Sequence, residues 1–260
     1  MAGRRRRFCP VLCGVRPVPV PPCGEALTVD NTDHGPTAAR AAEAIASSLL
    51  PFGLDLVHPF RVSWYDAQVE SEYHLPTRRG PDSLAVLVGN TRALWAKFLP
   101  EADRVLPDPL DRWIEEVFRR ALGAFDWVDD VIFAHEPPPR RLPMQRLVVA
   151  SGFAPLSAGQ LLAHVEYGPW FAVRAVVLVD APGPVGDRPD VGAPCAGCEA
   201  PCLPAFERAC EVTDVRTNHE KLRENWRPWL AVRDACPEGR AYRYTEDQIR
   251  FHYARTWPES

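Results

Sequence analysis

Hydrophobic residues recur along this 260-residue chain with two spacings, one typical of helices and one typical of strands. The clearest helical pattern runs from Leu110 to Leu122, where apolar residues fall three or four positions apart. Apolar or alternating runs predict strands at residues 54–65, 83–90, 127–136 and 170–179. Further helices are predicted at 37–50, 91–98 and 144–152. Near the cysteines, we predict a helix that begins near Pro204, after which the chain folds back through residues 226–235. This mixture predicts an α/β or α+β domain with a central sheet.

Proline divides the chain. Its 28 prolines concentrate at 17–22, 137–139 and 182–204, and such clusters mark loops or linkers. Residues 1–36 combine proline with the basic run Arg4–Arg7 and show no periodicity, so we predict a disordered extension. We predict one domain over 37–260, with a Cys/Pro-rich insertion at about 182–240.

Composition narrows the functional classes. The chain is 46% hydrophobic and 25% charged, which is typical of a globular protein. Its net charge of −4 argues against nucleic acid or an anionic membrane surface as a partner. The longest apolar stretch is interrupted by Arg174, which argues against a membrane span, and no secretory signal is evident. We therefore expect a cytoplasmic protein in a reducing compartment.

Several common catalytic motifs are missing. The sequence contains neither the phosphate-binding G-x-x-x-x-G-K-[ST] nor a G-x-G-x-x-G after a strand. It also lacks a G-x-S-x-G elbow and an H-E-x-x-H zinc motif. Common hydrolases and nucleotide-dependent enzymes thus lose support.

The sharpest local pattern is a group of cysteines. Cys195, Cys198 and Cys202 are closely spaced, and Cys236 precedes a proline further on. In a reducing compartment such thiolates can share zinc or an iron–sulfur cluster. The spacing departs from the ferredoxin run C-x2-C-x2-C-x3-C-P, so redox-active thiols and inert loop cysteines stay open as alternatives.

Two arginines lie within apolar segments. Arg174 interrupts the run WFAVRAVVLV, and Arg233 lies in WLAVRDACP. An unpaired buried charge is costly, so each needs a carboxylate partner or an anionic ligand. For Arg233 the simpler alternative is a salt bridge to a neighbouring acid. Two guanidinium groups converging on one cavity would suit carboxylates or phosphates.

Several segments, in the same order, resemble a known family. They are PFGLDLVHPFRVSWYD (51–66), YHLP (73–76), SLAVLV (83–88), DPLDRWIEE (108–116), YGPWFAVRAVVLV (167–179), WRPWLAVRDA (226–235) and YRYTEDQIRFHY (242–253). Together they cover about 50–255 and resemble the cobalamin-processing proteins of the cblC type, which are cyanocobalamin reductases and alkylcobalamin dealkylases. The resemblance implies an α+β, nitroreductase-like fold, related to flavin reductases, whose central sheet is flanked by helices.

The resemblance also implies an oxidoreductase activity. Such a protein binds base-off cobalamin (vitamin B12) and removes its upper axial ligand, by decyanation with NADPH and reduced FMN or FAD, or by glutathione-dependent dealkylation. It implies glutathione or corrinoid contacts at Arg174, Arg233, Trp170 and Phe171, with Arg255 as a looser third arginine. Expected partners are a flavin reductase and downstream cobalamin enzymes, and the expected state is a monomer or a ligand-induced dimer.

The chain also departs from the family. Residues 144–160 lack the tyrosines and histidines that the family has near the corrin. The cysteine group instead resembles a degenerate form of the ferredoxin-like run in the related epoxyqueuosine reductases, so a cluster could replace flavin as electron source. Two alternative functions stay open: a nitroreductase-like flavoenzyme without corrinoid, and a noncatalytic cobalamin carrier.

Overall fold

A computed structural model describes residues 36–190, 192, 194–213 and 223–258. The predicted disorder of residues 1–36 therefore falls almost wholly outside the described residues. Within them, four strands form one antiparallel sheet in the order β1-β2-β4-β3. The strands are β1 (Leu56–Arg61), β2 (Ser83–Asn90), β3 (Val128–Phe133) and β4 (Ala172–Pro182).

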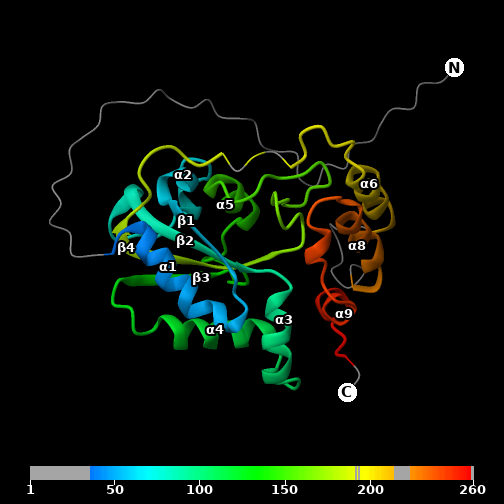
Figure 1. Cartoon of the computed structure of the whole chain (residues 1–260), viewed down its shortest axis with the longest axis horizontal. Coiled ribbons are helices and arrows are strands. Elements are labelled where there is room, and N and C mark those ends of the chain that lie inside the picture. The colour runs from blue at the N-terminus through cyan, green and yellow to red at the C-terminus, as the bar shows by residue number, and fades with distance from the viewer. Residues whose placement is uncertain (1–35, 191, 193, 214–222, 259–260) are drawn as a thin grey trace.

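Helices cover both faces of the sheet (Figure 1). On one face lie α1 (Ala38–Leu49) and α4 (Pro109–Leu122), and on the other lie α2 (Val62–Asp66) and α5 (Met144–Ser151). The central strand β2 is buried along its whole length. Its alternate residues serve both layers: Leu84 and Val86 face α1 and α4, whereas Ala85 and Leu87 face α2 and α5. An unbroken apolar run is what such a doubly covered strand requires.

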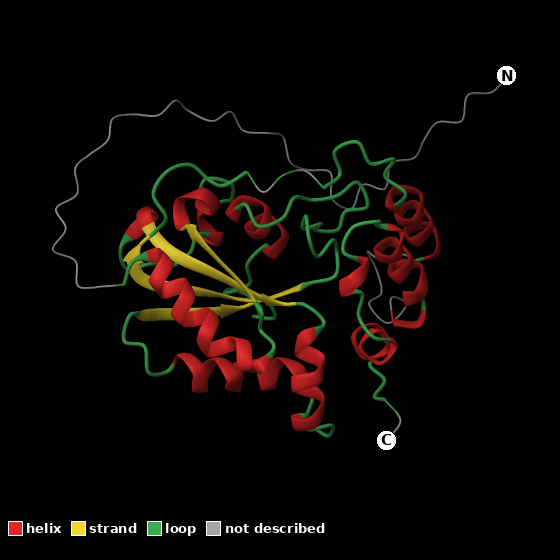
Figure 2. Cartoon of the chain, in the orientation of Figure 1, coloured by secondary structure: helices red, strands yellow, loops and turns green. Residues whose placement is uncertain are grey.

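Helix α3 (Ala93–Phe98) packs in the same core as α1 and α4. Three further helices of the described residues gather beyond one end of the sheet (Figure 2), namely α6 (Cys202–Val212), α8 (Trp226–Ala235) and α9 (Glu246–Ala254). Short 3-10 turns lie at Leu50–Phe52, Ser71–Tyr73, Gly80–Asp82, Leu99–Glu101 and Arg240–Tyr242. Between α6 and α9 two small apolar clusters form, one around Trp170 and Tyr244 and the other around Cys202 and Val232.

The predicted elements are largely confirmed. The stripe of α4 is buried as expected, with Trp113, Ile114 and Phe118 in the core. The predicted strand over 54–65 is wrong at its end, because Val62 begins α2. The predicted strand over 170–179 is shifted and runs from Ala172 to Pro182.

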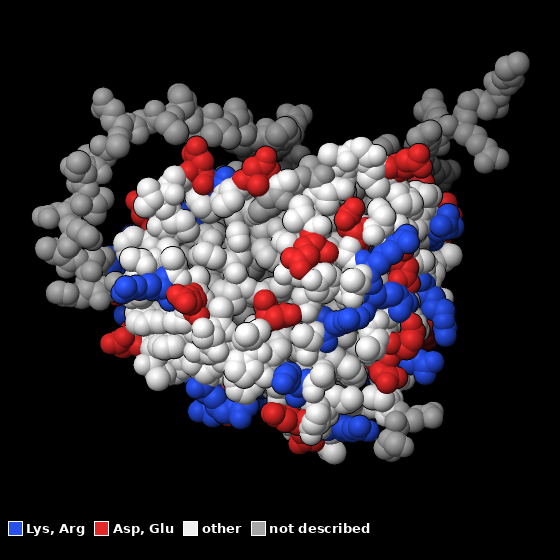
Figure 3. Space-filling view, in the orientation of Figure 1, with Lys and Arg blue, Asp and Glu red and all other residues white. Residues whose placement is uncertain are grey.

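The α+β class is confirmed by the mixed helices and purely antiparallel sheet. No helix among the described residues is long and apolar enough to cross a membrane. On the face drawn in Figure 3, basic and acidic side chains are interspersed over the C-terminal helices. That face therefore presents no extended surface of one charge.

Candidate functional site

Arg174 lies at an irregularity in strand β4. Val88 of β2 pairs with Ala175, whereas the next residue, Gly89, pairs with Val173, so Arg174 has no direct partner on β2. A Cβ atom on Gly89 would lie 2.5 Å from the carbonyl oxygen of Ala172, so glycine allows this close approach. Such a bulge redirects a side chain out of the regular alternation of the strand.

One hydrogen bond anchors the Arg174 side chain. Its Nε donates to Oδ1 of Asn90 at 2.6 Å. Its Nη2 is buried and has no hydrogen-bond partner among the described residues. The Arg174 guanidinium thus keeps a donor available for a ligand.

Arg233 approaches the same region from helix α8. Its Nη2 donates to the carbonyl oxygen of Phe171 at 3.3 Å, and its guanidinium lies 5.3 Å from the ring centroid of Trp170 and 5.4 Å from that of Tyr244. The neighbouring acid, Asp234, pairs with Arg243 instead. The salt bridge expected as the simpler alternative for Arg233 is therefore absent from the described part of the chain.

The two arginines line one cavity of about 440 Å³. This volume is in the range of small-molecule pockets. Tyr244, His252 and Tyr253 line it from the C-terminal segment, and Leu161, Ala172 and Trp229 complete its wall. Arg174 and Arg233 thus converge on one cavity, the arrangement that would suit a carboxylate or phosphate ligand.

The charges around this cavity are predominantly positive. Neither Arg174 nor Arg233 forms an ion pair with a carboxylate in the described ranges. Burial lowers the pKa of Arg174. Tyr244 and Asp111 act to raise this pKa, and the positive charges of Arg233 and Arg255 act to lower it. Burial also acts to lower the pKa of Arg233, but interactions with Tyr253 and Tyr244 raise it overall. An anionic ligand would relieve this repulsion.

His252 lies in the same positive surroundings. Its Nε2 atom is buried and has no hydrogen-bond partner among the described residues. Burial, together with Arg174, Arg233 and Arg255, holds the pKa of His252 well below its usual value. The imidazole is therefore neutral near pH 7. It adds a hydrogen-bonding group to the cavity wall without adding charge.

The other predicted contact residues lie behind the wall. Trp170 is 1% exposed, and Phe171 is also buried. Trp170 supports the guanidinium of Arg233 with its ring, and Phe171 does so with its carbonyl oxygen. Neither side chain lines the cavity, so direct contact with a ligand stays a prediction for both.

Sequence reasoning missed three polar wall residues, namely Tyr244, His252 and Tyr253. All three belong to the segment YRYTEDQIRFHY that carried part of the resemblance, and that motif was the available signal. Arg255 follows α9 as its C-cap, with a left-handed φ of 57°. Its charge lowers the pKa of both Arg174 and His252 but Arg255 is absent from the cavity wall.

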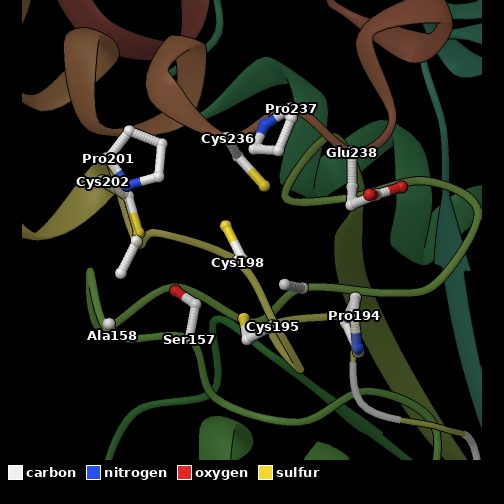
Figure 4. Close-up of a pocket in the computed structure, with 12 residues that line it drawn as sticks. Ser157, Ala158, Pro194, Cys195, Cys198, Pro201, Cys202, Cys236, Pro237 and Glu238 are labelled. Carbon is white, nitrogen blue, oxygen red and sulfur yellow. The ribbon is translucent and has the colours of Figure 1, made fainter.

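The four predicted metal ligands also come together. Cys195, Cys198, Cys202 and Cys236 line a second, enclosed cavity of about 20 Å³. Figure 4 shows the sulfur atoms of Cys198 and Cys236 facing each other, with Cys195 and Cys202 around the same space. The helices expected to allow this convergence are α6 and α8.

The four cysteines are present as thiols. Burial raises the pKa of Cys195 and of Cys236, and neighbouring cysteine sulfurs add to the rise in both. Among the described residues, no three histidine, cysteine, aspartate or glutamate side chains already have an arrangement that would hold a metal ion. The group is therefore a cluster of four cysteines around a small hollow.

Comparisons with known proteins give one consistent result. No protein-family model matches the chain. A protein of Mus musculus named cyanocobalamin reductase / alkylcobalamin dealkylase is 29% identical over 240 residues, covering 82% of this chain and 78% of its own length. The Homo sapiens protein of the same name is 28% identical over 240 residues, covering 82% and 77%. The Gallus gallus protein is 29% identical over 205 residues, covering 69% and 81%.

One solved structure is similar in fold. It is the crystal structure of the C. elegans B12-trafficking protein CblC, a homologue of human MMACHC, with a TM-score of 0.55 and 16% identity. The match covers 83% of this chain and 91% of that one. The resemblance drawn from the sequence motifs is thus confirmed: the chain is similar in sequence to proteins named cyanocobalamin reductase / alkylcobalamin dealkylase, and in fold to CblC.

Proposed function

We propose that this protein is a cobalamin-processing enzyme that binds base-off cobalamin and removes its upper axial ligand. Relatives named for this activity support the proposal, because they align with most of the chain. We place the activity in the cytoplasm, where glutathione is available and released cobalamin can pass to downstream enzymes. A nitroreductase-like ancestry of the sheet, and a monomer that dimerises around its ligand, belong to the same proposal.

The observation that carries the proposal is the pair Arg174 and Arg233 on one cavity. Glutathione bears two carboxylates and a thiol, and guanidinium groups bind carboxylates through paired hydrogen bonds. The unpartnered Nη2 of Arg174 provides a donor inside the cavity wall. We therefore assign glutathione to this cavity, with cobalamin at its mouth.

For alkylcobalamins the proposed step is a nucleophilic substitution. The glutathione thiol first gives its proton to solvent, and nearby guanidinium charge favours the thiolate. The thiolate attacks the cobalt-bound carbon, so a carbon–sulfur bond forms and the cobalt–carbon bond breaks. The electron pair of that bond stays on cobalt, giving a thioether and cob(I)alamin. Cobalt supplies the reactivity, and the protein supplies position and charge.

For cyanocobalamin the proposed step is a reduction. NADPH reduces FMN or FAD, and the reduced flavin gives two electrons to cobalt(III), which releases cyanide and leaves cob(I)alamin. We treat the flavin as a diffusible co-substrate delivered by a flavin reductase, because the cavity residues suit one anionic thiol ligand. A cluster bound by the cysteines, the other electron source considered from the sequence, has no part in this proposed step.

The visible spectrum of cobalamin tests the proposal. Purified protein is mixed with cyanocobalamin, and then anaerobically with NADPH, FMN and a flavin reductase, while cyanide release is measured. Methylcobalamin with glutathione is followed in parallel, with product thioether measured by mass spectrometry. We expect a base-off shift on binding and loss of the axial ligand in both reactions. A shift without either reaction would indicate a carrier, and no shift would contradict cobalamin binding altogether.

A further inference from the structure

The proposed cobalamin chemistry makes no use of the four cysteines at the small cavity. Three separate segments bring them there: a turn carries Cys195 and Cys198, Cys202 is the first residue of α6, and Cys236 follows α8. Four thiols from three segments meeting in one enclosed hollow (Figure 4) have no role in either proposed reaction. Such a group needs its own explanation.

We infer that Cys195, Cys198, Cys202 and Cys236 form a structural site for a single Zn²⁺ ion. The hollow of about 20 Å³ has room for one atom of roughly the size of a water molecule. A four-iron cluster contains four metal atoms and four sulfides and would need a far larger space. Closed, four-cysteine environments are typical of structural zinc.

Zinc binding at four thiols is a balanced exchange. Four zinc–sulfur bonds form, four protons leave to solvent, and no electron is transferred. The site therefore needs no oxidant or reductant.

Movement of the cysteine side chains would complete the site. The sulfurs do not yet have the arrangement of metal ligands, so the cysteines must rotate inward to reach a metal–sulfur distance of about 2.3 Å. Backbone hydrogen bonds from Ala158 to Cys195 and from Glu238 to Cys236 favour the negatively charged thiolates that zinc binds.

The ion would fix the wall of the larger cavity. The backbone N–H of Cys236 donates to the carbonyl oxygen of Arg233 at 3.1 Å, and Cys202 packs in one cluster with Val232 of α8. Holding Cys236 therefore holds the end of α8 that carries Arg233. This site does not depend on the proposed cobalamin function.

Metal analysis of the purified full-length protein tests the inference. Protein is prepared anaerobically without a metal-affinity tag, and zinc, iron and acid-labile sulfide are measured. We expect about one zinc per chain and no sulfide. Titration with a mercurial reagent in the presence of a zinc indicator should release that zinc as about four thiols react. Cobalt substitution should give the thiolate charge-transfer and visible bands of a tetrahedral site.

Matched variants locate the ion. Cys198→Ser and Cys236→Ser should retain less than about a tenth of the zinc, whereas Cys210→Ser, in the same helix as Cys202 but outside the cavity wall, should retain all of it. Circular dichroism shows whether each variant is folded. If a variant does not fold, the mercurial titration of the wild-type protein still tests whether these thiols hold zinc. Iron with sulfide, disulfides among these cysteines in mass spectrometry, or metal-free protein with freely alkylated thiols would each overturn the zinc site. If the wild-type protein contains zinc but does not process cobalamin, the proposed function is contradicted and the zinc site is not.

Discussion

Arg174 of β4 donates from Nε to Oδ1 of Asn90, the last residue of the neighbouring strand β2, at 2.6 Å. The amide of Asn90 thus fixes the direction of the guanidinium without neutralising its charge. Its other side-chain atom, Nδ2, donates to the carbonyl oxygen of Thr91 at 2.6 Å, which holds the amide in place. A neutral anchor of this kind leaves the positive charge available to a ligand in the cavity.

Replacing that anchor by an acid should weaken binding of the thiol substrate. In Asn90→Asp the new carboxylate would pair with Arg174 and compete with the carboxylates of glutathione. We expect glutathione affinity to fall about tenfold, equivalent to about 1.4 kcal/mol, with cobalamin affinity nearly unchanged. Isothermal titration with each ligand measures both. Asn90→Ala removes the hydrogen bond to Arg174 without adding a negative charge, so it separates the loss of the anchor from the added charge. If Asn90→Asp binds glutathione as tightly as the wild type, Arg174 does not bind a glutathione carboxylate.

Removing either cavity arginine should affect dealkylation more than corrinoid binding. Arg174→Ala and Arg233→Ala each remove charge-assisted hydrogen bonds, worth about 1.5–3 kcal/mol, from the thiol substrate. We therefore expect kcat/KM for glutathione to fall roughly tenfold to a hundredfold, with a smaller change in cobalamin Kd.

The same helix offers a control for this pair. Arg227 is exposed on α8 and lies over the ring of Trp226, 4.9 Å from its centroid, away from the cavity wall. Arg227→Ala should leave glutathione kinetics within about twofold of the wild type. Equal losses of dealkylation and corrinoid affinity in Arg174→Ala and Arg233→Ala would show that the arginines do not act on the thiol.

The cavity arginines were predictable because a charge within an apolar run is anomalous. Arg174 interrupts a strand whose other residues are almost all apolar, and the structure resolves the anomaly with a bulge and a cavity. The polar wall residue His252 gave no such signal, because it lies in a helix rich in charged and polar residues. Its importance arises from tertiary contact with the arginines, which sequence periodicity does not report.

The same distinction applies to the fold. Helix α4 was predicted because its apolar stripe continues from Leu110 to Leu122, almost the whole helix. Helix α2 was missed because it has only five residues, and the buried Val62 continues the alternation of Leu56 and Phe60 that predicts a strand. The conformation of such a short segment depends on the residues that it packs against. Helix α2 packs with α5 on the same face of the sheet.

A tight backbone contact beside Cys236 gives a stability prediction. Gly239 has a φ of 70°, and a Cβ atom there would lie 2.0 Å from the carbonyl oxygen of Tyr167. Gly239→Ala must therefore push two backbone segments apart, and we expect a loss of about 2–4 kcal/mol in unfolding free energy, measured by denaturant titration.

Gly186 provides the matched comparison. It also has a positive φ, of 95°, but a Cβ atom there would meet nothing within 4 Å. Gly186→Ala thus reports backbone strain alone, which we expect to be about 1 kcal/mol. If the two variants lose the same stability, the close contact at Gly239 is unimportant.

His252 should make the folded protein sensitive to acid. Burial and three nearby arginines lower its pKa in the folded protein, whereas in the unfolded chain its pKa returns to about 6.5. Below about pH 6.5 the unfolded chain therefore binds a proton that the folded protein does not. The free energy of unfolding must fall as pH falls, by up to about 1.4 kcal/mol per pH unit from this group.

Replacing the ring isolates this contribution. His252→Phe keeps an aromatic ring beside Trp95, Phe251 and Tyr244 but cannot bind a proton. His58 and His164 also have lowered pKa values and are unchanged in the variant, so the difference between the two pH profiles belongs to His252. Unfolding free energies measured by urea titration from pH 7.5 to 5 should fall less steeply for His252→Phe than for the wild type. Parallel slopes for wild type and His252→Phe would mean that the imidazole gains its proton in the folded cavity, and that the positive charge of Arg174 and Arg233 does not reach it.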